Sequence, residues 1–164
     1  MHPCRSAEVA PTTFAEELMT HYEAMKEKIV AIGECGLDYD RFNYADKDTQ
    51  LAVFPPHFDL AERTGLPMYL HSRATEGEFN RLVRENRSRF SGGVVHSFTG
   101  DLEDLNEILA MDLYIGVNGC SLKTQENIDV VKHIPMDKIM LETDCPYCEI
   151  RNSHASSKFV ETKF

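Results

Sequence analysis

One stretch of the sequence, residues 29–38 (Ile-Val-Ala-Ile-Gly-Glu-Cys-Gly-Leu-Asp), constrains the fold more than any other. It opens as an unbroken apolar run with β-branched residues, which is typical of a strand buried on both faces, as in a parallel sheet. Where this strand is expected to end, Glu34 stands between two glycines that allow other groups to approach closely. An ionised glutamate in apolar surroundings needs a cation, a metal ion or a shifted pKa, because burying an unpaired charge is costly.

Three later apolar runs also end at a residue that can hold a metal ion. These runs are 68–70 before His71, 93–95 before His96, and 139–143 before Asp144. In a parallel sheet the carboxyl ends of the strands meet at one edge, so the four side chains are expected to converge. Mixed imidazole and carboxylate ligands suit zinc, manganese or magnesium. The sequence therefore predicts a divalent metal site made by Glu34, His71, His96 and Asp144.

Between these strands the sequence has helical periodicity and capping residues. Helices are expected over residues 12–28 (capped by Thr12 or Thr13), 46–65, 75–89, 101–111 and 124–133, with a further strand over 113–117. Pro55 and Pro56 predict a kink in the second helix, or two short helices with Pro55 opening the second. Strands alternating with helices indicate a right-handed parallel α/β fold.

The intervals between strand ends suit successive βα units of a (β/α)8 (TIM) barrel, whose sites gather at the carboxyl ends of the strands. Five strands, with a strand stub at Met1–Pro3, make five to six βα units. A complete barrel takes about 250 residues, and this chain has 164. We therefore expect residues 1–164 to form a single, incomplete TIM-barrel domain.

The net charge and the distribution of apolar residues limit which macromolecules the chain is expected to bind. The net charge of −10 argues against simple binding of nucleic acid through a basic surface. It leaves room for an enzyme acting on nucleic acid, because bound divalent ions supply positive charge locally. The sequence has neither an apolar stretch near the roughly 20 residues of a membrane helix nor an apolar segment behind its N-terminus. We expect an intracellular protein, nuclear or cytoplasmic, that neither associates with a membrane nor needs an obligate protein partner.

The five cysteines are an odd number, which favours reduced thiols over a disulfide framework. Cys145 and Cys148 form a C-x-x-C motif, and Cys-Pro-Tyr-Cys is the sequence that glutaredoxins carry, so a glutaredoxin-like thiol oxidoreductase is an alternative. That motif needs a helix behind it and most of a small fold downstream, whereas only residues 149–164 follow. A turn leaving the last strand is the favoured interpretation.

Three further residues are candidates for binding substrate phosphates at the same edge. Arg73 lies two residues after His71, and Lys123 lies in the loop after residues 113–117. His2 precedes a proline at the end of the expected strand stub. Each of these is singly an ordinary surface residue, so their role depends on the metal site.

Four ordered motifs carry a family resemblance. Gly33–Tyr39 resembles the G-E-x-G-L-D-Y motif of the TatD family of metal-dependent deoxyribonucleases. Its later motifs are matched by Leu70–Arg73, His96–Gly100 and Glu142–Tyr147. The agreement runs from about Val30 to Cys148, and His154–Lys158 resembles the tail of the eukaryotic branch. The resemblance implies a TIM-barrel hydrolase that cuts phosphodiester bonds in DNA with two metal ions.

The resemblance also implies roles. Glu34 would bridge both metals, His71 and His96 would complete one site, and Asp144 would bind the other and take the proton from the attacking water. The family's first strand ends in His-x-His and its last is followed by Arg-Asn-Glu-Pro, and neither occurs here. We therefore expect a chain truncated at both ends, with one metal ion and weak or undetectable deoxyribonuclease activity. A non-catalytic remnant or isoform of such an enzyme is the alternative.

Overall fold

The computed structural model describes residues 1–159, which form a parallel α/β fold, as predicted. The strand order is β1-β2-β3-β4-β5, so each strand is hydrogen-bonded to its successor in the sequence. The chain divides into two compact units, Met1–Val94 and Val95–Phe164, each described by itself below. The prediction of a single domain over residues 1–164 stays a prediction.

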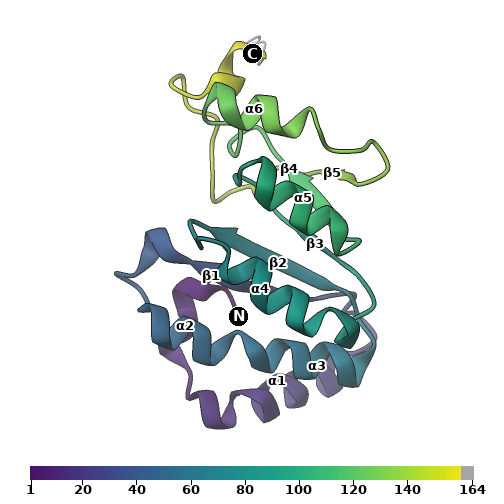
Figure 1. The fold of residues 1–164 in the computed structure, drawn as a ribbon. Helices are drawn as coiled ribbons and strands as arrows, with labels where there is room; N and C mark the ends of the chain where they lie inside the picture. Colours follow the sequence, from purple (N-terminus) through teal and green to yellow (C-terminus); the bar gives the residue numbers. More distant parts are fainter. Residues whose placement is uncertain (160–164) are drawn as a thin grey trace. The chain divides into compact units, whose positions relative to one another are not determined.

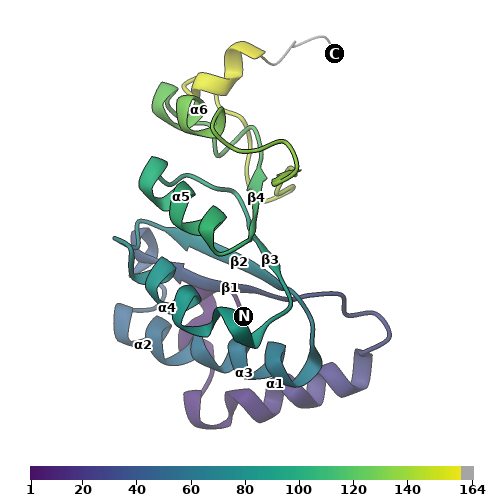
Figure 2. The same cartoon turned by 45° about the vertical axis from the view of Figure 1, so that its right-hand side comes forward.

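The first unit contains two parallel strands and four α-helices. Its elements are η1 Pro3–Glu8, α1 Pro11–Met25, β1 Ile32–Asp38, η2 Tyr39–Arg41, α2 Lys47–Val53, α3 Pro55–Thr64, β2 Met68–Arg73, α4 Glu78–Asn86 and η3 Arg87–Arg89, followed by β3 Gly93–Val95 at the division. β1 and β2 pair from Ile32 opposite Met68 to Asp38 opposite Arg73. Both views of the fold show α1 to α4 on the same side of β1 and β2 (Figures 1 and 2).

Aromatic side chains fill the space between the strands and helices of this unit. Phe54, Phe58 and Phe79 are fully buried. The ring of Phe54 lies 4.7 Å from that of Phe58 and stacks at 5.9 Å on that of Phe79, measured between centroids. These contacts join α3 to α4 beneath the strands, so the strand ends that carry polar residues rest on a close-packed core.

The first strand begins later than the sequence predicts. It starts at Ile32, not Ile29, and Val30 is 80% exposed, so the apolar run is not buried throughout. The reason is tertiary, because pairing begins only where β2 offers a partner: the Ile32 amide donates to the Pro67 carbonyl. Glu34 consequently lies within the strand and not at its end, at a register shift between Gly33 and Cys35.

The prolines act as predicted, whereas two helix starts do not. Pro55 opens α3 directly after α2, and Gly65 ends α3 in the left-handed region at φ 71°. α1 begins at Pro11 with Ala10 as its cap, so a cap at Thr12 or Thr13 is wrong: proline takes the first helical position instead. α4 begins at Glu78 and not near Thr75, because backbone with positive φ precedes it.

The predicted strand stub at Met1–Pro3 is also wrong. His2 is the N-cap of the 3-10 helix η1, and its Nδ1 accepts a hydrogen bond from the Cys4 amide. Proline at the next position favours the start of a helical turn over a strand. η1 packs on β1 and α2, which places His2 beside the first strand.

The second unit has the same alternation of strands and helices. Its elements are α5 Leu102–Ala110, β4 Tyr114–Val117, α6 Gln125–Val131, β5 Ile139–Leu141 and η4 Ala155–Phe159. β4 and β5 pair in parallel from Ile115 opposite Ile139. Asp101 caps α5, and Thr124 forms a capping box with Asn127 on α6, so both helices start where their capping residues predict.

One disulfide corrects the expectation of reduced thiols. Cys120, after β4, is bonded to Cys148, and Cys145 is a free, exposed thiol. Cys145 and Cys148 are therefore not bonded to each other, and no α-helix among the described residues follows them. This arrangement differs from the thiol oxidoreductase alternative, which needs a disulfide within the motif and a helix behind it. Among residues 1–159, no helix has the length and apolar character needed to cross a membrane.

Candidate metal centre

The candidate site of the first unit is organised around the His71 imidazole on β2. Its Nδ1 lies 3.0 Å from Oε1 of Glu34, and its Nε2 lies 3.1 Å from Oδ2 of Asp38. Both carboxylates come from β1, so the ring is held from two sides by the neighbouring strand. His71 is 6% exposed and Asp38 only 1%. The structure thus brings two of the predicted ligands, Glu34 and His71, into direct contact.

Strand geometry explains why these side chains meet. His71 lies opposite Gly36 in the register, and Gly36 stands between Glu34 and Asp38 on the same strand. A Cβ atom on Gly36 would lie 1.9 Å from the carbonyl oxygen of His71, so only glycine permits this approach of the strands. The register shift at Glu34 lets its side chain turn toward the ring.

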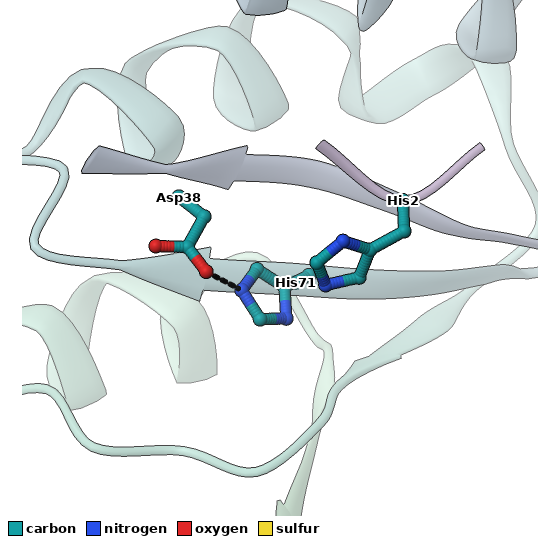
Figure 3. Close-up of side chains that lie close together, drawn as sticks. All are labelled: His2, Asp38 and His71. Atoms are coloured by element: carbon teal, nitrogen blue, oxygen red, sulfur yellow. Dashed lines mark hydrogen bonds and ion pairs between the residues drawn. The ribbon is translucent and has the colours of Figure 1, made fainter. Parts of the chain in front are cut away.

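His2 completes the group that we call the His71 cluster (His2, Glu34, Asp38 and His71). Its ring meets that of His71 edge-on at 4.6 Å, and its Nε2 lies 3.5 Å from Oε1 of Glu34. Figure 3 shows His71 between Asp38 and His2. Because Nδ1 of His2 accepts from the Cys4 amide, the neutral ring carries its hydrogen on Nε2 and presents a donor to Glu34.

His71 and Asp38 shift each other's pKa in the directions that favour a protonated imidazole beside an ionised carboxylate. Burial acts to lower the pKa of His71, but its hydrogen bonds to Asp38 and Glu34 outweigh burial and raise that pKa above the ordinary value. Burial acts to raise the pKa of Asp38, but the hydrogen bond from His71 and the charges of His71, Arg73 and Arg41 lower it. The two carboxylates therefore favour the protonated form of the imidazole, and a metal ion can take the place of that proton.

The cluster contains imidazole and carboxylate groups, which are the ligand types of divalent metal ions such as zinc and manganese. One ligand atom from each of His2, Asp38 and His71 lies within 4.8 Å of the others. The hydrogen bonds decide which of these atoms keeps a lone pair for a metal ion. If Asp38 keeps the hydrogen on Nε2 of His71, the lone pair on Nδ1 faces Glu34, which is the carboxylate–histidine–metal arrangement common in metalloproteins.

Arg73 and Lys123, the predicted phosphate-binding residues, have different surroundings. Arg73 ends β2, and its Nη1 lies 3.8 Å from Oδ2 of Asp38, so it belongs to the edge of the His71 cluster. Lys123 is an exposed residue of the second unit, and its carbonyl accepts a hydrogen bond from the Ala155 amide. Binding of phosphate by Lys123, and likewise by Arg73 or His2, stays a prediction.

In the second unit, His96 follows β3 and is 3% exposed. Its Nδ1 lies 3.6 Å from Oε2 of Glu142, and the other Glu142 oxygen accepts a hydrogen bond from the Ser97 amide. The Asn118 amide donates to Oγ of Ser97 at 2.5 Å, which ties β4 to the same loop. His96 is thus a buried histidine with a carboxylate beside it, as in the first unit.

Asp144 lies in the loop after β5, because that strand ends at Leu141 and not at Thr143 as predicted. Its backbone has a positive φ of 56°, and its Oδ2 lies 3.5 Å from Sγ of Cys148. The disulfide therefore attaches the loop that carries Asp144 to the segment after β4. The assignment of Glu34, His71, His96 and Asp144 to one metal centre stays a prediction.

Sequence reasoning missed three polar residues near these sites: Asp38, Arg41 and Glu142. A signal was present for two of them. Asp38 follows Glu34 and Gly36 at alternate positions, the spacing that puts side chains on one face of a strand. Glu142 stands two residues before Asp144. For Arg41, which follows the strand in the short helix η2, the sequence pattern offers no comparable signal.

A parallel α/β fold with buried imidazole and carboxylate groups at its strand ends is typical of metal-dependent hydrolases of the barrel type. The model of the TatD-related DNase family matches residues 1–163, and the chain belongs to this family. The family predicted from the four sequence motifs is therefore confirmed.

Individual relatives agree with this assignment. The chain is 42% identical to a Schizosaccharomyces pombe protein named deoxyribonuclease Tat-D, over 99% of this chain and 55% of that protein. It is 38% identical to an Edwardsiella piscicida protein named 3'-5' ssDNA/RNA exonuclease TatD, over 73% of this chain and 46% of that protein. The chain thus spans about half the length of these relatives.

A solved structure confirms the fold class. The crystal structure of a TatD family hydrolase from Entamoeba histolytica has a TM-score of 0.89 and 38% sequence identity to this chain. The match covers 100% of this chain and 55% of that one. The predicted α/β fold of the TIM-barrel hydrolase type, present in part, is therefore correct.

Proposed function

We propose that this chain is part of a metal-dependent deoxyribonuclease that hydrolyses phosphodiester bonds in DNA by means of an activated water molecule. The observation that carries the proposal is the His71 imidazole held between Glu34 and Asp38. A buried histidine fixed by two carboxylates of the neighbouring strand is a preorganised ligand for a metal ion. Membership of the TatD-related DNase family supports the choice of substrate.

Four residues are the proposed metal ligands: Glu34, His71, His96 and Asp144. When bound, magnesium, manganese or zinc would lower the pKa of a water molecule and polarise the phosphoryl group. Asp144 is proposed as the base that takes the proton of the attacking water. Glu34 is proposed as the shared ligand that sets the position of the site. We propose one ion for this chain and two for a complete site.

Asp38 has a positioning role in this proposal. By accepting the hydrogen bond from Nε2 of His71, it would hold the hydrogen on that nitrogen and direct the lone pair of Nδ1 toward Glu34, where the two groups could share an ion. Asp38 is almost fully buried, so its negative charge is available to the imidazole and is little screened by solvent.

Arg73 and His2 are proposed to meet the substrate. The Arg73 guanidinium lies at the edge of the cluster and is 26% exposed, so it can neutralise a phosphate that approaches the ligands. Nε2 of His2 carries a hydrogen in the neutral ring and can donate it to a phosphate oxygen in place of Glu34. Lys123 is proposed as a further phosphate contact. DNA is the proposed partner, and the intracellular location stays a prediction.

The test is cleavage of single-stranded DNA with Mg²⁺ or Mn²⁺, measured as acid-soluble nucleotide. We expect cleavage that EDTA abolishes and that Glu34→Gln and Asp144→Asn each lower by at least about 100-fold, since both remove a charged group from the site. Glu27→Gln, at an exposed glutamate after α1, is the matched control and should stay within about twofold of the parent. Cleavage unchanged in Glu34→Gln would refute the mechanism, and DNA binding without cleavage would favour the non-catalytic alternative.

A further inference from the structure

The segment that directly follows Asp38 of the His71 cluster carries exposed aromatic side chains. It begins with the short helix η2, directly after Asp38, and continues through Phe42 to Tyr44. Phe42 is 46% exposed and Tyr44 is 55% exposed. A single exposed aromatic residue is ordinary on a protein surface. Two of them in the short segment that directly follows Asp38, a member of the His71 cluster, are less common and suggest a binding surface.

The position of the Phe42 ring is fixed by its contact with Tyr39. Its ring lies against that of Tyr39 with centroids 5.0 Å apart. The Tyr39 hydroxyl donates a 2.6 Å hydrogen bond to Glu78, and the Lys47 ammonium lies 5.1 Å from the Tyr39 ring centroid. The Tyr44 amide donates to the Arg41 carbonyl at 3.0 Å, which closes the turn. The exposed surface of Phe42 is therefore a fixed platform, and little conformational entropy is lost when something stacks on it.

Arg41, next to Phe42, supplies a free positive charge. It is exposed, and within residues 1–159 no carboxylate lies at ion-pair distance from its guanidinium. Arg73 and Lys47, by contrast, already contact Asp38 and Glu78. Arg41 ends η2, the short helix that begins directly after Asp38 of the His71 cluster, so its charge stands three residues from that carboxylate in the sequence.

We propose that Phe42 and Arg41 form a nucleotide-binding subsite beside the His71 cluster. Phe42 stacks on an unpaired base of single-stranded DNA, and Arg41 binds the phosphate next to that base. Aromatic stacking combined with positive charge along the backbone is how proteins bind single strands without reading their sequence. Duplex DNA does not offer the face of a base, so the subsite selects single strands or frayed ends. This inference rests on the proposed function.

The subsite is tested by binding, measured as fluorescence anisotropy of a labelled oligothymidylate in Ca²⁺. The matched ligand is an abasic strand of the same length, which keeps every phosphate and lacks every base. We expect Phe42→Ala to weaken binding of oligothymidylate about tenfold and binding of the abasic strand less than about twofold. Phe42→Trp, which keeps the stacking face, should bind oligothymidylate at least as tightly as the parent.

Arg41→Ala gives a different signature from Phe42→Ala. It should weaken binding of both strands by the same factor, and it should make the dependence of log affinity on log salt shallower by about 0.7. Phe159→Ala is the control, since Phe159 is 68% exposed with the Lys158 ammonium 5.1 Å from its ring centroid. Its binding of both strands should equal that of the parent.

Two results would overturn the subsite. The first is equal loss of affinity for oligothymidylate and abasic strands in Phe42→Ala, and the second is no loss for either. In both cases cleavage that still depends on Glu34 leaves the proposed function in place. The converse result is a parent protein that binds oligothymidylate more tightly than the abasic strand, a Phe42→Ala variant that loses this difference, and yet no cleavage of DNA. That result would support the subsite and refute the proposed hydrolysis.

Discussion

Nε2 of His71 lies 3.1 Å from Oδ2 of Asp38, although the two residues are 33 positions apart in the sequence. The parallel register of β1 and β2 produces this contact, with His71 opposite Gly36 and Asp38 opposite Arg73. One strand thus supplies the imidazole and its neighbour the carboxylate that orients it. The contact assigns separate tasks to the two ring nitrogens, and the first two predictions follow from it.

His71→Ala should weaken binding of Mn²⁺ by at least about tenfold, because it removes the imidazole ligand. Calorimetric titration of the parent and variant measures the change. His133→Ala is the control, since His133 is exposed, and should bind as the parent does. Equal effects of the two substitutions would exclude His71 as a ligand.

Asp38→Asn should weaken Mn²⁺ binding about tenfold, because a neutral amide is a poorer acceptor for Nε2–H and no longer orients the ring. Asp40→Asn changes an exposed carboxylate two residues along the chain and should leave the affinity unchanged. The same calorimetric titration distinguishes them. If Asp40→Asn weakened binding as much as Asp38→Asn, the effect would come from net charge and not from the contact with His71.

Gly36→Ala should lower the free energy of unfolding by about 3 kcal/mol, because the added Cβ would lie 1.9 Å from the His71 carbonyl oxygen and must push the strands apart. Gly92→Ala is the control, since a Cβ there meets nothing within 4 Å. Urea denaturation followed by circular dichroism measures both. Comparable stability of the two variants would show that β1 and β2 do not approach as closely as described.

The stability of the chain should depend on pH through His57. Burial lowers the pKa of this histidine from 6.5 to about 3, and its Nδ1 contacts the Val53 carbonyl at 3.1 Å. Between pH 6.5 and 3, His57 is protonated in the unfolded chain and neutral in the folded chain. The free energy of unfolding should therefore fall as pH drops from 6.5 toward 3, by at most about 1.4 kcal/mol per pH unit from this residue.

Urea denaturation at pH 7, 6 and 5 tests this contribution. In His57→Gln the side chain no longer titrates, so the fall in stability with decreasing pH should be smaller than in the parent. The difference between the two proteins isolates His57 from the carboxylates, which both contain. Parallel curves for parent and variant would mean that His57 takes up its proton in the folded protein as readily as in the unfolded one.

The thiols should react unequally with Ellman's reagent. Cys145 is exposed and should react fast, whereas burial raises the pKa of Cys35 to about 12 and should keep it unreactive in the folded protein. In denaturant without reductant, three thiols should react, because Cys120 and Cys148 are bonded. Cys145→Ser should remove the fast phase. Five reactive thiols in denaturant would show that the disulfide is absent in solution.

The sequence by itself determined the features that depend on neighbours along the chain. Apolar runs placed β2, β3 and β5, Pro55 and Gly65 delimited α3, and Thr124 marked the start of α6. The histidines and carboxylates at strand ends indicated a metal-dependent hydrolase, and the four motifs predicted the family. These features could be predicted because a helix cap, a proline or an alternating pattern acts over a few residues.

Only the tertiary structure decided which groups touch. The start of β1 at Ile32, the contact between Asp38 and His71, and the bond between Cys120 and Cys148 all join segments that are distant in the sequence. Each depends on the register of two strands or the path of a loop, and a shift of one residue would turn a side chain to the opposite face. No local pattern encodes that register, because packing of the whole unit selects it.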